Sequence, residues 1–201
     1  MRSDGAVLSE PDTLPGGAGQ HAVRTLLAVL GEDVTRDGLR DTPDRVVRAL
    51  HEQTAGYRCD VRQILSKRFD GGDPAYAGIV ALRDVPFAST CEHHLLPFTG
   101  TATVAYIPNP GDRLVGLSKL ARLVDAFALR LQSQERMTVQ IVDALVEHLA
   151  PAAAACIVRA EHSCLNIRGV KKHTGGMVTS ELRGLFFDDL RARDELLALV
   201  R

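Results

Sequence analysis

Residues 78–108 read GIVALRDVPFASTCEHHLLPFTGTATVAYIP, and this stretch decides the fold class. The segments on either side of its centre are rich in β-branched and aromatic residues, which favour strands. The four residues CEHH, at positions 91–94, lie between the two segments. We expect two neighbouring strands that pair antiparallel, joined by a turn that carries thiol and imidazole side chains.

Helical patterns precede this stretch. Residues 20–30 carry apolar side chains at helical spacing and stop at Gly31, a common helix terminator. Thr42 is a capping residue, and Pro43 follows it at the first helical position. A second amphipathic helix is therefore expected from Thr42 through residue 53.

Helices also follow the two strands. Ser118 can cap a helix whose apolar residues recur at the i, i+3, i+4, i+7 spacing of one buried face. Those residues are Leu120, Leu123, Val124, Phe127 and Leu131. A longer helix is expected from about Gln134 to Leu149, with Pro151 ending it.

Strand-like composition returns in three segments, residues 155–162, 164–170 and 177–186, before a terminal helix around residues 190–200. The order is helices, two strands, two helices, two or more strands and a helix. Segregated elements of this kind favour the α+β class, with an antiparallel sheet and packing helices, over a doubly wound parallel sheet.

Length and charge limit the classes of function. A chain of 201 residues suits one domain, and 24 lysines and arginines against 25 aspartates and glutamates give a net charge of −1. This balance provides no electrostatic footprint for nucleic acid. The chain shows neither a signal peptide nor a membrane span, so we expect a cytoplasmic protein. Residues 1–19, rich in glycine, proline and acidic side chains, are expected to form a flexible arm.

The four cysteines are too few to suggest a disulfide scaffold in a chain of this size. Cys156 lies in an apolar, strand-like run, where a cysteine usually behaves as a small buried hydrophobe. Cys59 has no neighbour that suggests chemistry. Cys91 and Cys164 lie beside histidines.

Cys91 and His94 have the Cys-x2-His spacing that lets two side chains of one turn bind one ion, and Cys164 could reach it from an adjacent strand. Three ligands leave the fourth position of zinc open to water, as in catalytic sites. The spacing fits equally well a site closed by His93 or His162, and two buried thiols without a metal are a further alternative.

His93 and His162 are better candidates for proton transfer than for metal binding. Histidine titrates near neutral pH, and each of the two lies within two residues of a proposed ligand. From the residues alone, the pattern indicates a zinc hydrolase.

Several separate motifs resemble those of the GTP cyclohydrolase I family, in the same order along the chain from about Thr42 to the C-terminus. They are STCEHHLLPF (89–98), TVAYIP (103–108), GLSKLARLVDAFA (116–128), QERMT (134–138), EHSC (161–164), IRGV (167–170) and LRGLF (182–186). The resemblance implies one domain over residues 20–201, with N-terminal helices at 20–57 and a catalytic domain at 75–201.

The family has the tunnelling fold (T-fold), in which antiparallel sheets of neighbouring subunits join into a barrel. The resemblance therefore implies a homodecamer with active sites at subunit interfaces. Joining the sheets would also leave few unpaired strand edges.

The resemblance assigns the metal and catalytic residues. It implies that Zn²⁺ is bound by Cys91, His94 and Cys164. His162 would protonate the imidazole ring of guanine, and His93 would serve later proton transfers. Glu92 would steady a neighbouring ligand, although a solvated or capping carboxylate explains that residue nearly as well.

The resemblance also assigns the substrate contacts for GTP. Glu135 would accept hydrogen bonds from N1 and the 2-amino group of guanine, with Gln134 assisting at the same base edge. By itself Glu135 reads as an ordinary glutamate in the first turn of a helix. The triphosphate would be bound by Ser118, Lys119, Arg122, Arg168 and Arg45. Taken singly, each of the four basic residues in this set is explained equally well as a solvated surface charge.

The implied reaction is hydrolysis of GTP at C8 of guanine, with release of formate and formation of 7,8-dihydroneopterin triphosphate, the first step of tetrahydrofolate and pterin synthesis. One alternative is a paralogue with the same ring-opening chemistry in specialised pterin or deazapurine metabolism. Another is a nitrile reductase of the same fold, which uses NADPH and lacks the zinc triad. A third is a non-enzymatic, zinc-stabilised assembly module with a closed site. Residues 173–177 depart from the usual family pattern, which bears on phosphate binding.

Overall fold

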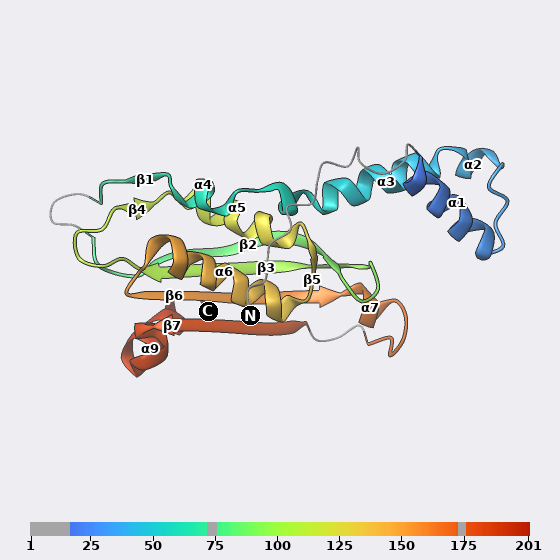
Figure 1. Ribbon diagram of the computed structural model, residues 1–201. Coiled ribbons are helices and arrows are strands. Elements are labelled where there is room, and N and C mark those ends of the chain that lie inside the picture. The colour runs from blue at the N-terminus through green and yellow to red at the C-terminus, as the bar shows by residue number, and fades with distance from the viewer. Residues whose placement is uncertain (1–16, 72–75, 173–175) are drawn as a thin grey trace, which may run out of the picture.

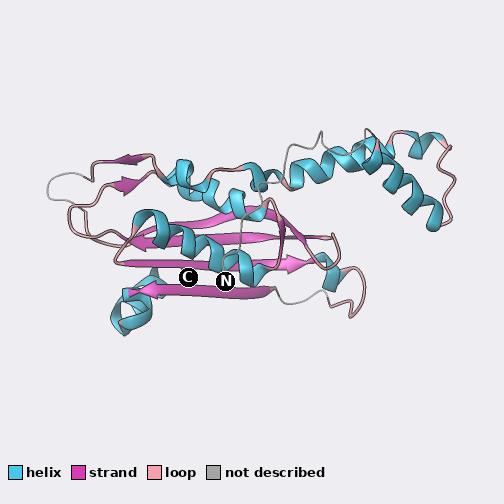
Figure 2. Cartoon of the chain, viewed as in Figure 1, coloured by secondary structure: helices cyan, strands magenta, loops and turns pink. Residues whose placement is uncertain are grey.

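The computed structural model describes residues 17–71, 76–172 and 176–201 (Figure 1). A layer of long strands carries two long helices on one face and the C-terminal helices against part of the other, and the N-terminal helices project away from this layer (Figures 1 and 2). The arm expected at residues 1–19 lies outside the described residues up to position 16. The first helix, α1, begins at Ala18.

The main sheet has five strands in the order β5-β2-β3-β6-β7. Its long members are β2 (Val80–Cys91), β3 (Pro97–Ile107), β6 (Ala153–His162) and β7 (Met177–Gly184), and each pairs antiparallel with the next. The predicted antiparallel pair around CEHH is confirmed. The two-residue β5 (Leu131–Gln132) lies parallel to the end of β2. The sheet and its helices have the α+β architecture expected of a T-fold.

The helices expected near both ends and in the middle of the chain are present. They are α1 (Ala18–Val29), α3 (Thr42–Gln53), α5 (Leu117–Ala128), α6 (Gln134–Leu149) and α9 (Leu190–Leu199). Shorter helices are α2 (Asp37–Arg40), η2 (Ala55–Arg58), α4 (Val61–Leu65), α7 (Ser163–Asn166) and α8 (Leu185–Asp188). Strands β1 (Arg68–Phe69) and β4 (Leu114–Val115) form a separate antiparallel pair.

Helix α3 runs from Thr42 to Gln53 as predicted, although Asp41 and not Thr42 occupies the capping position. Three other local predictions are wrong. Helix α5 starts after Gly116, so Ser118 lies inside its first turn. Leu131 belongs to β5, because α5 ends at Ala128. Residues 164–170 contain the short helix α7 instead of a strand. For Leu131 and for residues 164–170, the apolar pattern continues past a turn that backbone hydrogen bonds determine.

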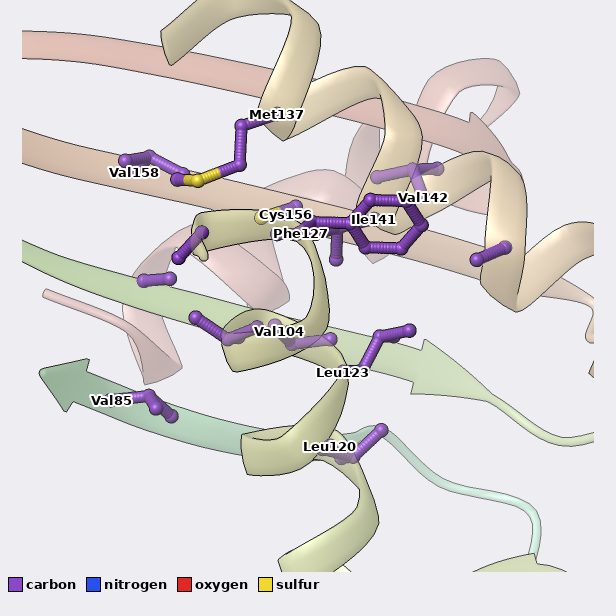
Figure 3. Close-up of a cluster of buried hydrophobic side chains, with 14 of the residues drawn as sticks. Val85, Val104, Leu120, Leu123, Phe127, Met137, Ile141, Val142, Cys156 and Val158 are labelled. Carbon is purple, nitrogen blue, oxygen red and sulfur yellow. The ribbon is translucent and has the colours of Figure 1, made fainter. Parts of the chain in front are cut away.

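The main core lies between the sheet and helices α5 and α6. Along β6, alternate side chains face this core, and the others face a second cluster beneath α8 and α9. Figure 3 shows the contact between helices and strands. The labelled side chains come from α5 and α6 and from β2, β3 and β6: Val85, Val104, Leu120, Leu123, Phe127, Met137, Ile141, Val142, Cys156 and Val158.

Cys156 is fully buried in this core, as predicted, and burial raises the pKa of its thiol to about 12. None of the helices among the described residues is long and apolar enough to span a membrane.

Replacing Ile141 by alanine tests the placement of α6. Ile141 has no exposed surface, so we expect the free energy of unfolding to fall by about 2–5 kcal/mol in chemical denaturation followed by circular dichroism. The matched control is Val146→Ala on the same helix, because that side chain is 42% exposed and the change should cost less than ~0.5 kcal/mol. Equal losses in the two variants would contradict the packing described for α6.

Candidate metal centre and active site

The turn between β2 and β3 forms around the backbone of Cys91. The Cys91 N–H donates to the Leu96 carbonyl and the Leu95 N–H donates to the Cys91 carbonyl, each at 2.8 Å. Leu95 takes a left-handed conformation with φ of 55°, which lets the chain reverse within a few residues. The tight turn brings His94 back toward the end of β2, so that its Nδ1 lies 3.8 Å from the Cys91 Sγ.

Cys164 reaches this turn from the far side of β3. Strand β6 pairs with β3 so that His162 lies opposite Phe98, near the start of β3. Helix α7 follows at once and holds Cys164, so this residue sits just beyond a strand rather than within one. The ligand atoms of Cys91, His94 and Cys164 all lie within 4.8 Å of one another.

The donor set and spacing of this cluster fit a zinc ion. Two thiols and one imidazole are the donors that zinc prefers, and in a tetrahedral zinc site such atoms lie about 3.5–3.8 Å apart. The separation of Cys91 Sγ and His94 Nδ1 is already in that range. Burial raises the pKa of the Cys164 thiol, and the neighbouring Cys91 raises it further, so binding of a cation would favour release of its proton.

The two candidate fourth ligands stand apart from the three-residue cluster. His162 has its Nε2 atom 2.8 Å from Oε1 of Gln134. His93 lies near the cluster, with its Nδ1 3.9 Å from the Cys91 Sγ, but it is not part of the group that could hold one ion. This arrangement is compatible with an open fourth position.

His162 is held by two contacts. Its ring stacks on Phe98, with centroids 4.7 Å apart and planes within 1° of parallel, and its Nε2 meets the Gln134 amide. Burial lowers the pKa of His162, and the negative charge of the nearby Glu135 opposes that shift. The imidazole therefore lies next to both the metal cluster and the start of α6.

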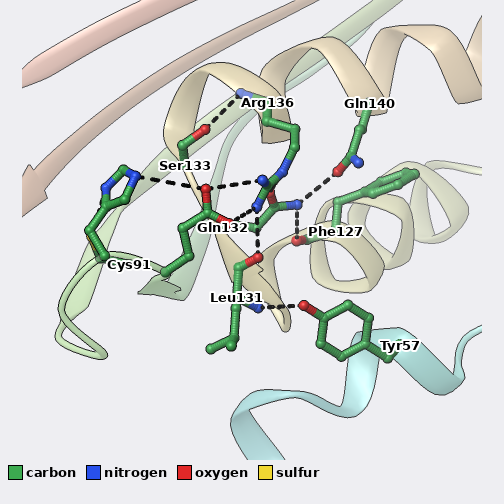
Figure 4. A network of polar contacts seen from close by, with 10 residues as sticks. Tyr57, Cys91, Phe127, Leu131, Gln132, Ser133, Arg136 and Gln140 are labelled. Atoms are coloured by element: carbon green, nitrogen blue, oxygen red, sulfur yellow. Dashed lines mark hydrogen bonds and ion pairs between the residues drawn. The ribbon is translucent and has the colours of Figure 1, made fainter. Parts of the chain in front are cut away.

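Glu92 is bound by Arg136 in a two-pronged ion pair. The two guanidinium nitrogens lie 3.0 and 2.6 Å from the two carboxylate oxygens (Figure 4). This pairing lowers the pKa of the Glu92 carboxyl. Arg136 also donates to the Gln132 side chain and the Leu131 carbonyl. It therefore links the turn that carries Cys91 and His94 to β5 and to the first turn of α6.

The basic residues predicted for the triphosphate are divided between locations. Arg168 lies close enough to Cys164 to lower the pKa of that thiol. Ser118, Lys119 and Arg122 occupy the first half of α5. Figure 1 shows α5 beginning near β4, at the end of the sheet opposite to β5 and α7. Helix α5 ends three residues before β5, which pairs with Cys91, so this set lies toward the end of the helix that is away from the metal cluster.

Arg45 lies on the projecting α3, where it forms an exposed ion pair with Asp41 at 3.1 Å. Within one chain it is not gathered with the metal residues.

A family model described as GTP cyclohydrolase I matches residues 19–201. The chain belongs to the GTP cyclohydrolase I family. The match starts at the second residue of α1 and includes every residue of the site described above.

Curated proteins of this family are similar over most of their length. GTP cyclohydrolase 1 of Thermoanaerobacter pseudethanolicus is 46% identical over 179 residues, which cover 89% of this chain and 93% of that protein. GTP cyclohydrolase 1 of a Synechococcus strain is 49% identical over 181 residues, which cover 90% and 77%. A solved structure of an archaeosine synthase QueF-Like in the apo form shares 16% identity at a TM-score of 0.42, over 54% of this chain and 96% of that one. A likeness at that level carries no argument.

Membership of the GTP cyclohydrolase I family does not by itself explain two parts of the site. Arg136 lies inside the QERMT motif, but its pairing with Glu92 joins residues 44 positions apart, so the motif itself does not indicate this role. Gln134 was expected at the base edge, yet its side chain is fully buried and all its polar atoms face protein partners. Neither arrangement has a signal in the local sequence.

Proposed function

We propose that this chain hydrolyses the guanine imidazole ring of GTP in a zinc-dependent reaction. The products are formate and 7,8-dihydroneopterin triphosphate, the entry to tetrahydrofolate and pterin synthesis. The observation that carries the proposal is the cluster of Cys91, His94 and Cys164 in a chain of the GTP cyclohydrolase I family. The proposal includes a cytoplasmic site of action, because the reducing cytoplasm keeps thiol ligands such as Cys91 and Cys164 available to a metal.

Zinc bound by the three ligands supplies a Lewis acid that makes water a usable nucleophile near neutral pH. His162, beside the cluster, delivers a proton to the imidazole ring of guanine as C8 is attacked. His93 is exposed on the same turn and serves later proton transfers. Glu92 is fixed by Arg136 and orients the turn that carries His93 and His94.

Glu135 recognises the base. Its carboxylate is exposed at the first turn of α6 and acts electrostatically on His162, which places it beside the proposed acid. A carboxylate accepts hydrogen bonds from both N1 and the 2-amino group of guanine, whereas adenine offers no such pair. Guanine bound in this way lies with its imidazole ring toward His162.

The triphosphate is bound by basic residues from more than one subunit. Ser118, Lys119 and Arg122 lie in the first half of α5, which runs toward β5 and the metal cluster, and Arg45 lies on the projecting helix α3. Among the described strands, β7 pairs with β6 alone, so its second edge is available to another sheet. These features support a homodecamer in which neighbouring subunits complete each site.

Two of the alternatives make different predictions about the metal. A zinc-stabilised assembly module needs a fourth protein ligand, and a nitrile reductase needs no zinc. A paralogue acting on a related pathway would share the ring-opening step. The departure at residues 173–177 falls mostly outside the described residues.

The first test supplies GTP to the zinc-loaded protein and measures formate together with the fluorescence of the oxidised pterin. We expect both products, and we expect Cys91→Ser to lose bound zinc and activity together. The control is Cys59→Ser, because Cys59 is exposed and takes no part in the cluster. Wild-type protein that binds zinc but releases no formate from GTP would reject the proposal.

The second test changes Glu135 to alanine and compares GTP with inosine triphosphate, which lacks the 2-amino group. Loss of the carboxylate should lower kcat/KM for GTP by about 10²-fold or more, while the difference between the two substrates shrinks. Zinc content should be unchanged. If this variant prefers GTP over inosine triphosphate as strongly as the wild-type protein does, Glu135 does not recognise the base.

The third test mixes two inactive variants, Cys91→Ser and Lys119→Met, and lets their subunits exchange. If each site takes its metal from one subunit and Lys119 from another, random mixing restores roughly a quarter of the sites. The control is mixing each variant with itself. No recovery, despite demonstrated exchange of subunits, would show that one chain supplies both parts.

A further inference from the structure

The side-chain amide of Gln134 lies wholly inside the protein, between His162 and strands β6 and β7. Its exposed fraction is zero. The Nε2 atom lies 3.1 Å from each of the carbonyl oxygens of Val158 and Met177 and 3.2 Å from the Thr179 hydroxyl, so its two hydrogens serve three acceptors and one of them is shared. The Oε1 atom lies 2.8 Å from Nε2 of His162.

These contacts permit one orientation of the amide. Backbone carbonyl oxygens can only accept hydrogen bonds, so they must face the NH2 group. A flipped amide would place Oε1 against the carbonyls of Val158 and Met177 and leave a buried acceptor without a donor, at a cost of about 1–3 kcal/mol. The amide oxygen therefore faces His162.

The neighbouring threonines are consistent with this orientation. The Thr138 hydroxyl donates to the backbone carbonyl of Gln134 at 2.7 Å, so it can only accept from the Thr179 hydroxyl 2.6 Å away. With its proton given to Thr138, Thr179 can only accept from the Gln134 amide. Each hydroxyl proton has one destination.

The orientation of the Gln134 amide also determines which ring nitrogen of His162 carries a hydrogen. Since the amide oxygen accepts, Nε2 of the imidazole must carry the hydrogen. Stacking on Phe98 leaves the ring two orientations in one plane, and the flipped one would place Cε1 instead of Nε2 against the Gln134 oxygen and lose the hydrogen bond. Among the described residues, no hydrogen-bond partner occupies Nδ1.

We infer that Gln134 is a positioning residue that holds His162 with its hydrogen on Nε2, so that Nδ1 is the ring nitrogen that exchanges a proton with the substrate. The inference deepens the proposed function, because it rests on His162 as the acid of ring opening. In that step the N–H bond at Nδ1 breaks, a bond forms between that proton and the guanine imidazole nitrogen, and the electron pair stays on Nδ1. Gln134 then acts through His162 and not at the base edge.

Neutron diffraction of the wild-type protein crystallised in heavy water tests the assignment without any variant. Deuterium is expected on Nε2 of His162, whether or not Nδ1 also carries one, and the two amide deuterons of Gln134 should point toward β6 and β7. A bare Nε2 atom, or an amide oxygen facing the carbonyls of Val158 and Met177, would overturn the inference.

Kinetics of Gln134→Met separate positioning from base recognition. The methionine has a similar length but offers the imidazole no strong acceptor. We expect kcat for GTP to fall about 10–100-fold, part of what a well-placed general acid contributes, while KM and the ratio of GTP to inosine triphosphate activity hold. The matched control is Thr179→Val, which removes a partner of the same amide but keeps the contact with His162, and its kcat should fall less than about 3-fold.

A rise in KM with a changed ratio of the two substrates would place Gln134 at the base and contradict the inference. Zinc content and unfolding curves of both variants show whether they fold. If Gln134→Met does not fold, the neutron result decides. Failure of the wild-type protein to open GTP would reject the proposed function instead, and would leave the hydrogen positions at His162 as they are found.

Discussion

The antiparallel pairing of β3 with β6 is the contact on which the metal centre depends. It runs over ten residue pairs and ends with His162 opposite Phe98. This register sets the start of α7, and with it Cys164, beside the turn that carries Cys91 and His94. A slip of one residue would turn every side chain of β6 to the other face and carry His162 away from Phe98. Core packing of Val158 and Cys156 against α5 and α6 opposes such a slip.

The first turn of α6 links the separate parts of the site. Three consecutive residues of this turn interact with different neighbours. Gln134 contacts His162, and the charge of Glu135 acts on the same imidazole. Arg136 pairs with Glu92 in the turn after β2. Ser133 caps the helix by accepting from the Arg136 N–H, which fixes where the turn begins. Because neighbouring helical positions lie about 100° apart, one turn can serve three directions at once.

The sequence predicted much of this arrangement from local patterns. The strands around CEHH and helix α6 could be predicted from periodicity, and the residue types at Cys91, His94 and Cys164 marked them as candidate ligands, which the structure brings together. The short elements α7 and β5 could not, because backbone hydrogen bonds and tertiary pairing define them. The burial of Gln134 and the pairing of Glu92 with Arg136 depend on contacts between distant segments, which no local pattern records.

The spacing of the ligands along the chain has a consequence for biosynthesis. Cys91 and His94 lie in one turn, whereas Cys164 lies 70 residues beyond His94 and reaches the turn only after β6 has paired with β3. During synthesis, Cys91 and His94 leave the ribosome well before Cys164 is made. Two ligands alone hold zinc weakly. In the proposed zinc site, the sheet would therefore have to form before the ion is held, so a folded scaffold would capture the metal and the metal would not nucleate folding.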